Sequence, residues 1–122
     1  MADILVVDDE GFIRTTIGAV LRRAGHTVRQ AADGAECLSL FSERHPDLLI
    51  TDIVMPAPEG NELIRMIRRA AASLPILAIS GASAPEEFAQ QAIAAGATQA
   101  LVKPFGLNDM LLHVEKLLAK AK

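Results

Sequence analysis

Five polar side chains follow or close short apolar runs where neither a strand nor a hydrophobic core needs them: Asp8, Asp9, Asp52, Ser80 and Lys103. Adjacent carboxylates repel each other, and three carboxylates held close together cannot all stay charged without a cation. Because no Cys or His cluster accompanies them, the oxygen ligands favour Mg²⁺, which keeps several waters and binds phosphates. We therefore expect an acidic magnesium site.

The same residues suit phosphoryl chemistry. A carboxylate can attack phosphorus and become an aspartyl-phosphate, which is the role predicted for Asp52. The ammonium of Lys103 can bind a phosphoryl oxygen as a point charge, and the hydroxyl of Ser80 can donate to another. Together they predict a metal-assisted carboxylate that accepts a phosphoryl group.

The aspartates also have ordinary structural explanations. Asp8 or Asp9 could cap a helix that follows, although a cap uses one residue and two are present. Asp52 could begin a turn, because prolines and a glycine follow it. The convergence of several reactive groups favours metal binding and phosphorylation over these roles.

Ser80 and Lys103 can be explained structurally as well. Ser80 could cap a helix, but Ser83 with Glu86 forms the better capping box. Lys103 could be a solvated surface lysine, the commonest fate of that residue type. Its position between a strand and a proline favours the phosphate role.

Apolar runs that predict strands alternate five times with segments of helical periodicity. The runs cover residues 3–7, 27–31, 48–51, 76–80 and 100–102. This alternation predicts an α/β fold, a flavodoxin-like, doubly wound five-stranded parallel sheet of order 2-1-3-4-5 with helices on both faces. The run at 27–31 carries Arg29 and Gln30 and is expected at an edge, whereas Arg68 and His113 are expected to face solvent. We predict one domain over residues 1–122.

That strand order gives the polar residues a common location. In open α/β sheets, ligands bind beyond the carboxyl ends of the strands, where the winding direction reverses. Here the reversal falls between runs 3–7 and 48–51. Side chains that follow four different strands are therefore expected to meet in one crevice.

Composition argues against several other classes of protein. The chain has 122 residues, of which 51% are hydrophobic, so disorder is not expected. A net charge of −3 argues against nucleic acid as the main partner. No apolar stretch is long enough to span a membrane, and the N-terminus is not a signal peptide. A single cysteine, Cys37, excludes an intrachain disulfide and favours the cytoplasm.

Four motifs, "VVDDE", "LLITDIVMPAPEG", "AISGAS" and "LVKPF", occur in this order along the chain. In sequence and spacing they resemble the receiver domain of bacterial two-component response regulators of the chemotaxis-regulator type. The resemblance covers nearly the whole chain. It implies a phosphorelay signalling domain in which Asp52 accepts a phosphoryl group from a histidine kinase or a histidine phosphotransfer protein.

The resemblance also implies a role for each site residue. Its metal ligands are Asp8, Asp9, Asp52 and the backbone carbonyl of Val54, with Asp9 binding more directly and Asp8 partly through water. Beside the acceptor Asp52, the family uses residues matching Ser80 and Lys103 to contact phosphoryl oxygens. The bond between Lys103 and Pro104 is typically cis in the family.

One departure from the family concerns output. A downstream protein is expected to bind the face formed by the fourth helix, the strand at 100–102 and the helix at 107–120. The aromatic residue that usually changes rotamer there is replaced by Ala100, and the chain has no Tyr or Trp. A small conformational response would suit a phosphate shuttle or sink.

Three other functions compete with this interpretation. A magnesium-dependent phosphohydrolase with an aspartate nucleophile usually has a second acid two residues later, where this chain has Val54. A flavin-nucleotide protein would need a phosphate loop, and "DDEG" repels phosphate without a metal. A receiver-like module that is never phosphorylated would not need the intact set of site residues. We therefore expect signalling chemistry and no metabolic turnover.

Overall fold

The computed structural model describes residues 2–53, 60–81 and 85–121, so the expectations for Val54 and Ser83 lie outside the described residues. Strand and helix alternate as β1 Asp3–Val7, α1 Gly11–Arg23, β2 Thr27–Ala31, α2 Gly34–Glu43, β3 Leu48–Asp52, α3 Gly60–Ala70, β4 Ile76–Ser80, α4 Pro85–Ala95, β5 Gln99–Val102 and α5 Leu107–Ala121. Each predicted strand is found within one residue of its expected bounds.

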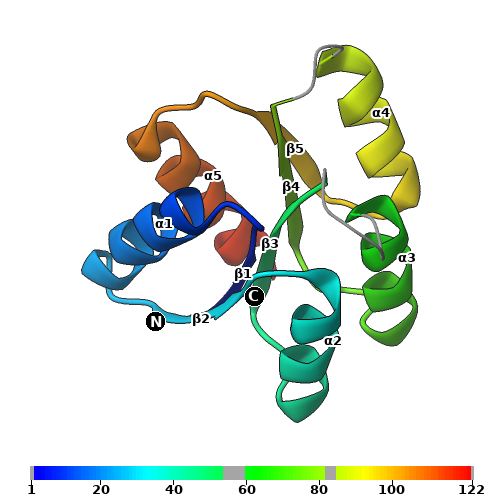
Figure 1. Ribbon diagram of the computed structural model, residues 1–122, viewed down its shortest axis with the longest axis horizontal. Coiled ribbons are helices and arrows are strands. Elements are labelled where there is room, and N and C mark those ends of the chain that lie inside the picture. Colours follow the sequence, from blue (N-terminus) through cyan, green and yellow to red (C-terminus); the bar gives the residue numbers. More distant parts are fainter. Residues whose placement is uncertain (1, 54–59, 82–84, 122) are drawn as a thin grey trace.

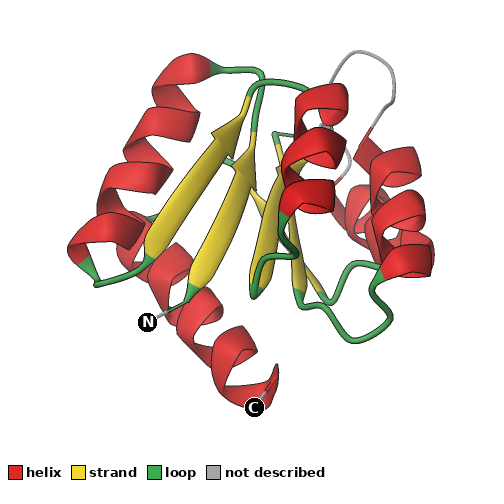
Figure 2. Cartoon of the chain, turned by 90° about the horizontal axis from the view of Figure 1, so that it is seen from below, coloured by secondary structure: helices red, strands yellow, loops and turns green. Residues whose placement is uncertain are grey.

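The strands form one parallel sheet of order β2-β1-β3-β4-β5, which confirms the predicted fold. Their arrowheads point toward the same edge of the sheet (Figure 2). Strands β3 and β4 are buried along their whole length, as expected for central strands with helices on both faces. The winding direction reverses between β1 and β3, because β2 lies on one side of β1 and all later strands lie on the other.

Two helical layers cover the sheet, α1 and α5 on one face and α2, α3 and α4 on the other (Figure 1). Each layer buries its own hydrophobic core, so alternate residues of a strand belong to different cores. In β1, Ile4 and Val6 pack toward α1 and α5, while Leu5 and Val7 pack toward the other three helices. This packing fixes the register of the strands and therefore the height at which each strand ends.

Arg29 shows how a charged residue is accommodated in the edge strand β2. Its guanidinium donates to both carboxylate oxygens of Asp3 at 3.2 and 2.9 Å. It also donates to the carbonyls of Leu40 and Arg44 at 2.7 and 2.8 Å, at the end of α2. The arginine thus binds two carbonyls at the C-terminal end of α2, where helix carbonyls have few partners within the helix.

The prediction that Arg68 and His113 face solvent is wrong. Both are half-buried. Arg68 donates to the carbonyl of Gly96 at 3.0 and 2.7 Å and to those of Ala71 and Ala72, so it joins the ends of α3 and α4. His113 Nδ1 lies 2.6 Å from the side-chain nitrogen of Gln99. Helical periodicity does not reveal contacts of this kind, because they depend on how helix ends meet.

Gly60 packs directly on the end of β3. A Cβ atom at this position would lie 2.3 Å from Ile53 Cα and 2.8 Å from the carbonyl oxygen of Asp52. The backbone N–H of Gly60 donates to the Ile53 carbonyl at 3.0 Å. Only a residue without a side chain allows α3 to start this close to the strand that ends in Asp52.

Replacing Gly60 by alanine is therefore expected to destabilise the fold. We expect Gly60→Ala to lower the free energy of unfolding by about 1–3 kcal/mol, because the backbone of β3 must move to admit a methyl group. Urea denaturation measures this change. Gly11→Ala is the matched control, because its Cβ would meet only Arg14 Nη2 at 3.7 Å. Equal stability of the two variants would contradict the close packing.

Candidate functional site

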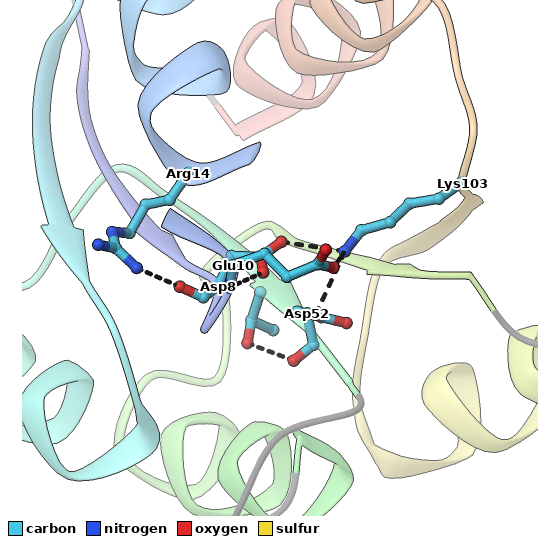
Figure 3. A network of polar contacts seen from close by, with 6 residues as sticks. Asp8, Glu10, Arg14, Asp52 and Lys103 are labelled. Carbon is cyan, nitrogen blue, oxygen red and sulfur yellow. Dashed lines mark hydrogen bonds and ion pairs between the residues drawn. The ribbon is translucent and has the colours of Figure 1, made fainter. Parts of the chain in front are cut away.

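The sheet brings the predicted residues to one edge. Asp8 follows the last residue of β1, Asp52 ends β3, Ser80 ends β4 and Lys103 follows β5. In the sheet, Ser80 pairs with Val102 and Asp52 with Ile79, so these strands end at nearly the same height. Side chains of Asp8, Asp52 and Lys103 converge there, as Figure 3 shows.

Lys103 is the centre of this site. Its Nζ lies 3.1 Å from Asp8 Oδ2, 3.1 Å from Glu10 Oε1 and 3.3 Å from Asp52 Oδ2. Burial alone would lower the pKa of Lys103, but the hydrogen bonds to Asp8 and Glu10 and the neighbouring carboxylate charges outweigh burial. The pKa of Lys103 is therefore raised, and the ammonium stays charged near neutral pH.

Asp8 is held rigidly. Its side chain is fully buried, and its Oδ1 accepts the backbone N–H of Glu10 at 2.9 Å. Its backbone carbonyl accepts Arg14 Nη1 at 2.6 Å, and its backbone N–H donates to Ala31 at 3.2 Å. Neither Asp8 nor Asp9 caps α1, because Glu10 occupies the N-cap position and makes no side-chain cap hydrogen bond. The structural explanation of the aspartate pair as a helix cap is therefore wrong.

Three carboxylates lie close enough to share a divalent cation. Among the described residues, oxygen atoms of Asp8, Glu10 and Asp52 all lie within 4.8 Å of one another. An all-oxygen donor set with two buried aspartates fits Mg²⁺. Asp9 is exposed and outside this group, although it lines the same pocket of about 340 Å³ with Asp52 and Lys103. The metal role of Asp9 stays a prediction.

Glu10 is the site residue that the sequence prediction missed. It is the third acid of "DDE", placed two residues after Asp8 and one before the start of α1. Its closeness to the end of β1 could have marked Glu10 as a candidate, because a residue so near a strand end can reach the same crevice. Nothing in the spacing indicates that its carboxylate turns toward Lys103.

Ser80 adds a hydroxyl to the same edge of the sheet. It is fully buried, and its Oγ has no hydrogen-bond partner among the residues that the structure describes. Buried polar atoms without partners are rare and costly. An unpaired hydroxyl at the end of β4 fits a donor to an anionic group. The bond from Lys103 to Pro104 is cis, as the resemblance predicted.

The comparisons with known proteins define the family. The profile of the response regulator receiver domain matches residues 4–115, and the chain belongs to this family of signalling domains. The response regulator MprA of Mycobacterium ulcerans is 36% identical over 119 residues, which are 98% of this chain and 51% of that protein. The chain thus spans about half the length of the curated relatives it matches.

Solved structures agree with this assignment. The chemotaxis response regulator CheY4 of Vibrio cholerae is similar with a TM-score of 0.89 and 35% identity, over 96% of this chain and 98% of that one. NtrX of Brucella abortus gives a TM-score of 0.92 and 35% identity, over 98% of this chain and 27% of that one. In the described part of this chain, no helix has the length and apolar character needed to cross a membrane.

Removing the central ammonium tests the electrostatics of the site. Lys103→Met is expected to cost about 3 kcal/mol of stability in metal-free buffer, because the buried carboxylates lose their cationic partner. Added Mg²⁺ should then stabilise Lys103→Met more than wild type, since no ammonium competes for the same oxygens. Thermal unfolding with and without Mg²⁺ measures both effects.

The matched control is Lys116→Met, which removes an exposed lysine of α5. Its stability and its response to Mg²⁺ should equal those of wild type. A Mg²⁺ response of Lys103→Met no larger than that of wild type would contradict a cation site made by these carboxylates.

Proposed function

We propose that this receiver domain is a phosphoacceptor in which Asp52 takes a phosphoryl group from the phosphohistidine of a histidine kinase or histidine phosphotransfer protein. The reaction depends on Mg²⁺. The observation that carries this proposal is the 3.3 Å ion pair between Lys103 Nζ and Asp52 Oδ2, beside the buried carboxylate of Asp8. A carboxylate nucleophile and a phosphate-binding cation are thus within reach of one phosphoryl group.

The chemistry requires three actions from the chain. A carboxylate oxygen of Asp52 forms a bond to phosphorus, while the phosphorus–nitrogen bond of phosphohistidine breaks and its electron pair returns to the imidazole nitrogen. Lys103 pairs with one phosphoryl oxygen as the charge on that group shifts. The buried hydroxyl of Ser80 donates to another. Later attack by water on phosphorus releases inorganic phosphate and restores the free carboxylate.

The metal would be held at the same edge. Asp8 and Asp52 supply carboxylate oxygens, and the family resemblance adds Asp9 and the carbonyl of Val54. When bound, Mg²⁺ offsets negative charge on the phosphoryl oxygens. Without a divalent cation, the surplus of carboxylates over the ammonium of Lys103 repels an incoming phosphoryl dianion.

A hydrolase acting on external phosphate esters is the weaker alternative. Such an enzyme needs an acid that protonates its leaving group, and the residue two positions after Asp52 is the apolar Val54. We propose that self-phosphorylation and self-dephosphorylation are its only turnover, as expected of a signalling domain. The single cysteine favours the cytoplasm as its location. Neither nucleic acid nor membrane is proposed as a partner of this domain.

The proposed output surface is the face formed by α4, β5 and α5. The backbone N–H of Lys103 donates to the carbonyl of Ser80 at 2.7 Å, so the phosphate-binding residues join the ends of β4 and β5 directly. Phosphorylation therefore changes the charge balance at both strand ends together. A downstream protein that binds this face would sense the change.

Phosphorylation of Asp52 can be tested with acetyl phosphate and Mg²⁺, followed by intact mass measurement. Wild type should gain one phosphoryl group, whereas Asp52→Asn and a chelator-treated sample should gain none. Asp109→Asn, an exposed aspartate in the first turn of α5, is the matched control and should react like wild type. Labelling of Asp52→Asn would move the acceptor to another residue, and continuous turnover of assorted phosphate esters would favour the hydrolase.

The replacement of the usual aromatic by Ala100 predicts a small conformational response. Ala100 is half-buried against the core cluster that includes residues of α4, and its methyl group has no alternative rotamer. Amide NMR shifts between the free and beryllofluoride-bound domain should be large near Asp52 and small beyond β5. Large shifts spread across residues 84–118 would contradict a shuttle-like output.

A further inference from the structure

All three donors of the Lys103 ammonium are engaged before any phosphoryl group is present. A lysine ammonium has three N–H donors and no acceptor. Its Nζ lies 3.1 Å from Asp8, 3.1 Å from Glu10 and 3.3 Å from Asp52. A phosphoryl oxygen on Asp52 can gain this ammonium only if one of these contacts is given up.

The partners of Lys103 differ in how easily they can be released. The side chain of Asp8 is fully buried, and its second oxygen is held by the backbone N–H of Glu10 at 2.9 Å. Asp52 is the acceptor itself and is only 4% exposed at its side chain. The side chain of Glu10 is 60% exposed. Glu10 can therefore leave Lys103 and regain hydration in water at little cost.

We propose that Glu10 is a positioning residue that holds Lys103 across the pocket in the unphosphorylated domain and is displaced by the phosphoryl group on Asp52. This inference rests on the phosphoacceptor function proposed above. Figure 3 shows the side chains of Glu10 and Lys103 reaching toward each other, with Asp52 below them in the view. Glu10 thus sets how strongly the empty site resists phosphorylation.

Glu10 disfavours the phosphorylated state of Asp52 through two physical effects. Its carboxylate competes with phosphoryl oxygens for the ammonium of Lys103. It also lies close to Asp52, since oxygen atoms of the two side chains are within 4.8 Å of each other. A dianionic phosphoryl group at Asp52 is therefore repelled by Glu10. Neutralising Glu10 should favour the phosphorylated state through both effects.

From the same location, Glu10 could instead favour phosphorylation by helping to bind Mg²⁺. If Glu10 mainly helped to bind Mg²⁺, its neutralisation would weaken metal binding and disfavour phosphorylation. The two roles separate when Mg²⁺ is saturating for each variant, because a loss of metal affinity is then compensated by concentration. Metal saturation can be followed independently by the rise in thermal stability with Mg²⁺.

The test measures the affinity of beryllofluoride, a phosphoryl mimic, by calorimetry at saturating Mg²⁺. Glu10→Gln is expected to bind about fivefold more tightly than wild type at low ionic strength, the factor typical of one nearby charge in water. Glu10→Asp keeps the charge on a shorter side chain and should fall between the two. Glu43→Gln is the matched control, because Glu43 is exposed at the far end of α2, and it should bind like wild type.

Ionic strength provides a second measurement that a merely structural role would not affect. The advantage of Glu10→Gln should shrink as salt rises from about 0.02 M to about 0.5 M, because salt screens the exposed charge of Glu10. Equal or weaker binding by Glu10→Gln at saturating Mg²⁺, with wild type binding normally, would overturn this inference alone. No binding by wild type would overturn the phosphoacceptor proposal and this inference with it.

Discussion

Three carboxylates gathered around one ammonium are the interaction on which this structure depends. Asp8 and Asp52 are buried, and Lys103 is the cation that makes their proximity tolerable. The balance is incomplete, because Glu10 adds a further negative charge to the same ammonium. A site with surplus negative charge is poised to take up a divalent cation. The metal and phosphate binding proposed above would use this surplus of negative charge.

The parallel sheet is what makes this concentration of charge possible. Asp8 and Lys103 are 95 residues apart in the sequence, yet they contact each other because β1 and β5 end at the same edge. Two separate cores, one on each face, hold the strands in register. Gly60 then brings the start of α3 against the backbone of Ile53, just beyond Asp52. The carboxylate of Asp52, the proposed acceptor, therefore lies on a closely packed support.

Most of the fold and much of the site could be predicted because they depend on repeated, local patterns. Apolar runs predicted the five strands, and the structure confirms each of them within one residue. Asp8, Asp52 and Lys103 could be predicted together because parallel strands place their carboxyl ends at one edge. Glu10 and Arg68 were missed because their roles depend on side-chain direction. In both cases a long side chain turns back toward a partner that is remote in the sequence.

The ends of β4 and β5 connect the pocket to the proposed output face. Ser80 and Lys103 are joined by a backbone hydrogen bond of 2.7 Å, so the ends of β4 and β5 respond together. Farther along β5, Ala100 offers no large side chain that could alternate between a buried and an exposed rotamer. On the function proposed for Asp52, the signal would pass through the backbone of β5 and the packing of α4. Because packed backbone moves little without a bistable element, the phosphoacceptor function proposed above favours passing on a phosphoryl group over a large conformational switch.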